Sequence, residues 1–146
     1  MIETLKLALN DMQGKLFEMS REKGYDSESF ISAFMTSQIA VDLDADFNHV
    51  QWAGKEYIME RIENELKDKI VKGGELYDIE TLYWTGYVYR QWHYYTGESS
   101  KDIYKQAKAK TMRATYYPYH TMSVEMAIDR LKESYKSKWN KEKIKK

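Results

Sequence analysis

The segment 78–95 constrains the fold of this chain more than any other part of the sequence. Between Glu80 and Glu98 the only formal charge is Arg90, and seven aromatic side chains surround it: Tyr83, Trp84, Tyr87, Tyr89, Trp92, Tyr94 and Tyr95. A helix that is apolar on all sides is normally buried at the centre of its domain. Its many phenols, with Arg90 and His93, need polar partners, which a lipid bilayer does not supply. We therefore predict a buried central helix whose polar centre is Arg90 and His93, satisfied by tyrosines and backbone carbonyls.

Helical periodicity continues through most of the remaining sequence. The first 22 residues carry an a/d pattern over two and a half heptads, formed by Ile2, Leu5, Leu9, Met12, Leu16 and Met19. This pattern is shorter than a free-standing coiled coil needs, so we expect docking into a bundle, with a homodimer through the seam as the alternative. Further helices are predicted from about 26 to 39, 52 to 70, 78 to 95, 99 to 107 and 123 to 139. Gly86 should allow a neighbouring helix to approach the central one closely.

These elements predict one all-α domain over residues 1–146, a single compact bundle of about six helices. No internal repeat or interdomain linker interrupts the sequence. Pro118 disfavours helix in the residue before it, so we expect the aromatic stretch 116–119 to be irregular. The basic residues from about 137 to 146 are expected to form a frayed tail.

Composition excludes several classes of function. The chain has no cysteine, which rules out disulfides, thiolate zinc sites and cysteine nucleophiles. No apolar run is long enough for a membrane span, and the first residues do not resemble a signal peptide, so we expect a cytoplasmic protein without membrane contact. Asp42, Asp44, Asp46 and Asn48 alternate like an EF-hand loop, but Phe47 and Ala53 occupy the positions of the required glycine and glutamate. We therefore predict no metal site and no cofactor.

The zero net charge hides a marked asymmetry along the chain. Residues 1–75 carry 9 basic and 15 acidic side chains, whereas residues 76–146 carry 14 basic and 8 acidic ones. A basic half interleaved with tyrosines can contact phosphates and stack on unpaired bases, so nucleic-acid binding is one hypothesis. The acidic half and the absence of a recognised DNA-reading motif weigh against it, and an ordinary solvated helical surface is the simpler explanation.

One pair of residues is a candidate for catalysis. Six residues separate Arg113 from His120. This spacing resembles the Arg-x(4–6)-His motif of HEPN ribonucleases, which are small all-α proteins that cut RNA without a metal, often as dimers. The resemblance implies His120 as general acid or base and Arg113 as the group that stabilises charge on the phosphate. The similarity covers two residues and a fold class, and Pro118 lies inside the motif.

The aromatic content favours a different role. Tyr and Trp together number 17, which is more than a core of this size needs, and both residues are enriched at protein–protein interfaces. We predict a non-catalytic protein-binding module, with the HEPN-like ribonuclease or RNA-binding protein as the alternative. The predicted contact edge joins the stretch before His120 to the basic carboxy-terminal helix, and its candidate residues are Arg113, Tyr116, Tyr117, Tyr119, Lys136 and Trp139.

Three segments of the chain carry a family resemblance: GYDSESFISAFMTS at 24–37, LDADFNHVQWAGKEYIME at 43–60 and ETLYWTGYVYRQWHYYTGESSKDIY at 80–104. They resemble a family of small helical bacterial proteins associated with toxin–antitoxin cassettes. The resemblance implies a cytosolic antitoxin-like or accessory protein that binds and regulates a partner, which could be a toxin encoded nearby. It assigns no functional residues.

Overall fold

The computed structural model describes residues 1–46 and 48–144, with the side chains of 143 and 144 left aside. The regular secondary structure of these residues is all helical, apart from one isolated β-bridge between Tyr25 and Lys72; turns and loops connect the helices. The described part contains eight α-helices and one 3₁₀ helix, more than the six that were predicted. They are α1 (Glu3–Glu22), α2 (Ser27–Met35), α3 (Gln38–Asp44), η1 (His49–Trp52), α4 (Gly54–Glu65), α5 (Ile79–Thr96), α6 (Ser100–Gln106), α7 (Ala109–Tyr119) and α8 (Val124–Ile144).

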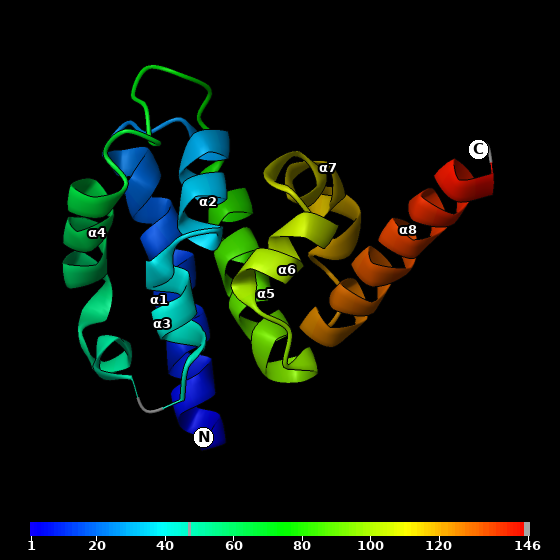
Figure 1. Cartoon of the computed structure of the whole chain (residues 1–146), viewed down its shortest axis with the longest axis horizontal. Helices are drawn as coiled ribbons and strands as arrows, with labels where there is room; N and C mark the ends of the chain where they lie inside the picture. Colours follow the sequence, from blue (N-terminus) through cyan, green and yellow to red (C-terminus); the bar gives the residue numbers. More distant parts are fainter. Residues whose placement is uncertain (47, 145–146) are drawn as a thin grey trace.

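The two long helices α1 and α5 lie side by side at the centre of the bundle (Figure 1). They meet at Gly14 and Gly86, where a Cβ atom on Gly86 would lie 2.5 Å from the Gln13 carbonyl oxygen and 3.0 Å from the Gly14 Cα. The Gln13 side-chain amide donates a hydrogen bond of 3.0 Å to the Gly86 carbonyl. The predicted close approach at Gly86 and the central position of this helix are therefore confirmed.

The first helix buries a wider face than its a/d pattern suggested. Leu9 and Leu16 are buried, Met12 and Met19 pack against the core, and the polar residues Asn10 and Gln13 are fully buried as well. The reason is that α1 packs against α5, α4 and α2, so residues on either side of the a/d pattern are covered too. The helix docks into the bundle, which was the preferred prediction.

Two predicted helices have different bounds in the structure. The helix expected from 26 to 39 is divided at Ser37, whose hydroxyl donates to the Phe34 carbonyl and accepts from the Ala40 amide, ending α2 and beginning α3. A side chain that bonds to both neighbouring turns competes with the helical ladder. The helix expected from 52 to 70 is limited to Gly54–Glu65, with 3₁₀ geometry before it and turns after it.

The aromatic stretch 116–119, expected to be irregular, lies within α7. Pro118 is inside this helix, and the helix ends one residue later at Tyr119. A proline cannot donate the backbone hydrogen bond to the carbonyl four residues earlier and it crowds that carbonyl, but only Tyr119 of the helix follows Pro118, so little of the helix has to continue past the distortion. The prediction of irregular structure at 116–119 was therefore wrong.

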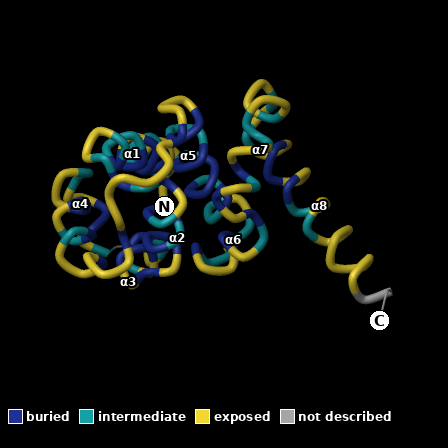
Figure 2. The backbone as a smooth tube through the Cα atoms, turned by 90° about the horizontal axis from the view of Figure 1, so that it is seen from above, coloured by how far each residue is buried: buried dark blue, intermediate teal, exposed yellow. Residues whose placement is uncertain are grey.

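The last helix leaves the body of the protein (Figures 1 and 2). Its first half is anchored, because Ala127, Ile128 and Leu131 are buried. From 133 to 142 every side chain is exposed except that of Tyr135, which is half-buried; we call this part the α8 arm. The tail predicted to fray from about 137 is helical up to Ile144, and residues 145–146 lie outside the described residues.

Candidate functional site

An open cleft forms where α1, α5, α7 and the start of α8 meet. Its volume is about 530 Å³, and it is lined by Glu18, Ile79, Glu80, Tyr83, Trp84, Tyr87, Tyr116, His120 and Val124. Five of these residues come from α5, because a helix that is aromatic on all sides cannot bury every ring within one small domain. We call it the aromatic cleft.

The walls of the aromatic cleft are rings that contact one another. Along α5, the centroids of Tyr83 and Tyr87 are 6.0 Å apart. Trp84, also on α5, meets Tyr116 of α7 edge-on, with the ring centroids 5.7 Å apart. The centroids of the Tyr116 and His120 rings are 4.4 Å apart. Tyr83, Trp84, Tyr87 and Tyr116 are all half-buried, so each keeps part of its surface open to the cleft. The cleft therefore offers aromatic surface to a ligand that enters from outside.

The charged residues of the aromatic cleft are two carboxylates, Glu18 and Glu80. Burial raises the pKa of Glu18, and the like charges of Glu22 and Glu80 raise it further, although Lys15 lowers it. Among the described lining residues there is neither lysine nor arginine. The cleft therefore combines aromatic surface with two carboxylates that no lysine or arginine of its described lining neutralises.

The residues predicted for the contact edge are divided among several environments. Tyr116 and His120 line the aromatic cleft, and Tyr117 is 84% exposed. Tyr119 packs against the core as a partly buried side chain. On the α8 arm, Lys136 is exposed and Trp139 is 51% exposed.

Arg113 and His120 lie on the same helix but contact different groups. Arg113 pairs with Glu75 at 2.8 Å and stacks over the Tyr77 ring at 4.6 Å. His120 lies two turns further on, where its Nδ1 is 2.9 Å from the carbonyl oxygens of Tyr116 and Tyr117. Two helical turns correspond to about 11 Å along the axis. Within one chain, the structure does not bring the two side chains together.

Arg90 forms the buried polar centre of the bundle. Its side chain is 1% exposed and donates 2.7 Å to Asp44, with further hydrogen bonds to Gln13 at 2.9 Å and Ser100 at 3.3 Å. Asp44 also accepts hydrogen bonds from the backbone amide and the hydroxyl of Ser100, each at 2.8 Å. This network joins α1, α3, α5 and the start of α6.

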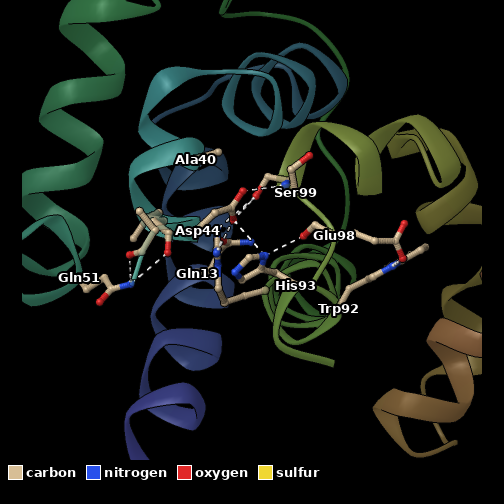
Figure 3. Close-up of polar contacts among 12 residues, drawn as sticks. Gln13, Ala40, Asp44, Gln51, Trp92, His93, Glu98 and Ser99 are labelled. Carbon is tan, nitrogen blue, oxygen red and sulfur yellow. Dashed lines mark hydrogen bonds and ion pairs between the residues drawn. The ribbon is translucent and has the colours of Figure 1, made fainter. Parts of the chain in front are cut away.

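His93 extends the network toward the end of α5. Its Nδ1 lies 2.7 Å from the Glu98 carbonyl oxygen and 3.8 Å from Asp44 (Figure 3). The Glu98 carboxylate accepts from the Trp92 indole and forms an ion pair with Lys132 of α8. A backbone carbonyl thus serves His93, as predicted, whereas the hydrogen bonds of Arg90 go to an acid, an amide and a hydroxyl. One tyrosine, Tyr94, also interacts with Arg90, whose charge favours the ionised phenol and so opposes the rise in the Tyr94 pKa that burial causes.

Sequence reasoning missed Asp44, Gln13 and Ser100 as partners of Arg90. It considered Asp44 only as one of the alternating acids of a calcium-loop pattern, although its side chain is only 12% exposed and pairs with Arg90. A buried arginine requires an acid, because an unpaired charge in the interior is costly. That requirement was the available signal, but it does not identify which of the 23 acidic residues is the partner.

Two of the alternating acids, Asp42 and Asp44, form ion pairs with arginines of other helices. Asp42 pairs with Arg61 at 3.0 Å on one face of α3, while Asp44 pairs with Arg90 on the other. Across the described ranges, no group of three or more His, Cys, Asp or Glu side chains is arranged to hold a metal ion. Among the same residues, no helix has the length and apolarity that a membrane crossing requires.

Comparisons with known proteins found no similar protein. Neither a protein-family model, nor a curated protein, nor a solved structure matches this chain. Arguments about function therefore depend on the geometry of the molecule itself.

Proposed function

We propose that this chain is a non-catalytic protein-binding module whose partner contacts the face formed by α7 and the α8 arm. The resemblance noted in the sequence makes an antitoxin-like or accessory role the natural form of this function. In that role the partner is a cytoplasmic protein that is regulated by being bound.

The observation that carries this proposal is the α8 arm. An exposed helical segment gains little from tertiary packing, although packing usually provides most of the stability of a helix in water. The arm nevertheless presents Trp139 at 51% exposure, while Tyr117 on α7 is 84% exposed. Exposed aromatic side chains of this kind provide the anchors of protein interfaces, since they combine a large apolar area with a polar tip.

Charge supports the same face. Residues 130–146 contain eight basic and two acidic side chains, of which three lysines and both acids belong to the α8 arm. A basic segment of this kind steers an acidic partner toward it during diffusional encounter. We therefore expect the partner to present an acidic patch to the α8 arm.

The alternative of RNA cleavage receives less support from the geometry. Arg113 is occupied by Glu75 and Tyr77, and His120 lies at the far end of α7. A catalytic pair would need Arg113 to leave both partners, or a second copy to supply one member of the pair.

The test is affinity purification of the tagged full chain from its native host, with the eluate analysed for protein and RNA. The arm variant Lys136→Glu/Trp139→Ser should lose the protein that the wild type retains. The control Lys67→Glu/Trp52→Ser makes the same two changes at exposed positions on the other side of the body, and it should retain that protein.

Two outcomes would contradict the proposal. One is a partner that the arm variant retains as well as the wild type does. The other is cleavage of RNA by the purified chain that His120→Ala abolishes, since this result would assign the ribonuclease function instead.

A further inference from the structure

We propose that the aromatic cleft receives an arginine side chain of the partner protein. This inference rests on the proposed function, because it places the arginine on a protein that contacts the α7–α8 face. The cleft adjoins that face directly, since Tyr116 and His120 belong to the end of α7 and Val124 begins α8.

The aromatic walls suit a flat cation. The rings of Tyr83, Trp84, Tyr87 and Tyr116 are half-buried around one space. A guanidinium stacks on aromatic faces, where the ring quadrupole attracts its positive charge. This chain already contains such a contact, because Arg113 lies 4.6 Å from the centroid of the Tyr77 ring.

The charge of the aromatic cleft identifies the sign of its ligand. Glu18 and Glu80 both line it, and no lysine or arginine stands among the described residues of its lining. Burial raises the pKa of Glu18, and the charges of Glu22, Asp11 and Glu80 add to this effect, although Lys15 opposes it. A cation that enters the cleft relieves that repulsion, whereas an anion increases it.

The openness of the cleft favours a side chain of a protein over a free small molecule. The cleft has a volume of about 530 Å³ and is open to the surroundings. Small-molecule sites usually enclose most of their ligand's surface. Arginine is favoured over lysine because its planar fork can stack on a ring and donate to a carboxylate at the same time.

The experiment uses the full ¹⁵N-labelled chain and nuclear magnetic resonance. The probes are N-acetyl-arginine amide and its neutral near-isostere N-acetyl-citrulline amide. The indole signal of Trp84 is assigned by its loss in Trp84→Phe. We expect saturable shifts of the Trp84 signal with the arginine probe, with a dissociation constant on the order of millimolar, and at least about tenfold weaker binding of the citrulline probe.

Two matched double variants measure how much the carboxylates of the aromatic cleft contribute to the affinity for the arginine probe. Glu18→Gln/Glu80→Gln should weaken binding of the arginine probe by about tenfold. The control Glu56→Gln/Glu60→Gln also removes two negative charges, from exposed positions on α4, and it should leave the affinity unchanged. The comparison of the two probes uses the wild type alone, so it stands even where a variant folds poorly.

Several results would overturn the inference. Equal shifts with both probes, or no saturable shift up to about 50 mM of the arginine probe, would remove its basis. Tighter binding of tetramethylammonium than of the arginine probe would assign a small quaternary ammonium ligand. Self-association that only the cleft variant abolishes would make a second copy the occupant. The titration needs no partner, so its failure is distinguishable from failure of the proposed function, which the affinity purification tests through the α8 arm.

Discussion

Arg90 is the residue on which the interior of this protein depends. A buried charge is costly unless it is paired and hydrogen-bonded. Here the cost is offset by Asp44, Gln13 and Ser100, which together occupy all three nitrogens of the guanidinium. Because these partners come from α3, α1 and the start of α6, Arg90 fixes the positions of several short helices around α5.

Removal of the acid should therefore be much more damaging than removal of an acid nearer the surface. We expect Asp44→Asn to lower the free energy of unfolding by about 3–5 kcal/mol, because it leaves the Arg90 charge buried without a counter-ion. The matched control is Asp42→Asn on the same helix, where the Arg61 pair is partly exposed, and it should cost about 1 kcal/mol or less. Urea unfolding at neutral pH measures both, and equal losses for the two variants would contradict this view of Arg90.

At the scale of elements, the pair α1 and α5 determines how closely the bundle packs. The backbones meet at Gly14 and Gly86, and the space that a Cβ atom would need at Gly86 is occupied by the Gln13 carbonyl. Contact between backbones leaves no flexible side chain that could move aside, so a substitution there must separate the helices.

The Gly86→Ala variant tests this contact, because the contact determines whether alanine raises or lowers the free energy of unfolding. Helix propensity alone predicts that alanine stabilises the middle of a helix by about 1 kcal/mol relative to glycine. Overpacking against Gln13 should outweigh that gain and give a net loss of about 1–3 kcal/mol. Thermal and urea unfolding report the sign, and a stabilised variant would show that α1 and α5 do not approach so closely.

Glu98 adds a polar contact to the buried apolar anchor of α8. Burial alone would raise the pKa of this carboxyl, but hydrogen bonds from Lys132, Gln106, Trp92 and Thr96 outweigh burial and lower the pKa to about 2. A carboxyl with a depressed pKa contributes stability above its unfolded value of 4.5, and it loses that contribution as the pH falls toward 2. Acid should therefore weaken the anchor of α8.

Glu98→Gln isolates this contribution. The free energy of unfolding of the wild type should exceed that of the variant by about 1–2 kcal/mol above pH 5, after allowance for partial exposure, and the difference should disappear by about pH 2. Urea unfolding at a series of pH values between 2 and 7 measures the difference. Parallel pH profiles for the two proteins would contradict the assigned role of Glu98.

The elements that the sequence predicted well are those whose pattern is set by burial. The helix over 78–95 was identified because a nearly uncharged aromatic segment can be accommodated only inside a domain, and Gly86 was identified as its point of contact. The errors lie where a single local hydrogen bond, or the place where a helix ends, determines the secondary structure. Ser37 divides a continuous apolar pattern with its own hydrogen bonds, and Pro118 is tolerated because α7 ends one residue later.

The candidate site was predictable only in part, for a related reason. Tyr116 and His120 were singled out from the sequence, but their neighbours Glu18, Tyr83 and Trp84 belong to helices that are distant in the chain. Which face of α5 stays open depends on where α7 and α8 pack, and periodicity carries no information about that. For the same reason, periodicity could not show that Arg90 pairs with Asp44, which lies 46 residues earlier.

At the scale of the whole molecule, a packed body carries an exposed basic arm. Residues 1–75 form the acidic part of the body with a net charge of −6, and residues 76–146 carry +6 and include the arm. A partner that touches both the arm and the aromatic cleft would meet opposite charges at neighbouring positions. Such alternation favours one orientation of the partner, since the reversed orientation places like charges against each other.

Hydrogen exchange of the full chain, alone and in complex with the protein that it captures, tests the central claim most directly. In the free chain the amides of 133–142 should exchange rapidly, because every side chain of this segment except that of Tyr135 is exposed. In the complex we predict at least about tenfold slower exchange for these amides and for the end of α7, with α4 unchanged. Slower exchange confined to α4, or an unchanged α8 arm in a stable complex, would contradict the account.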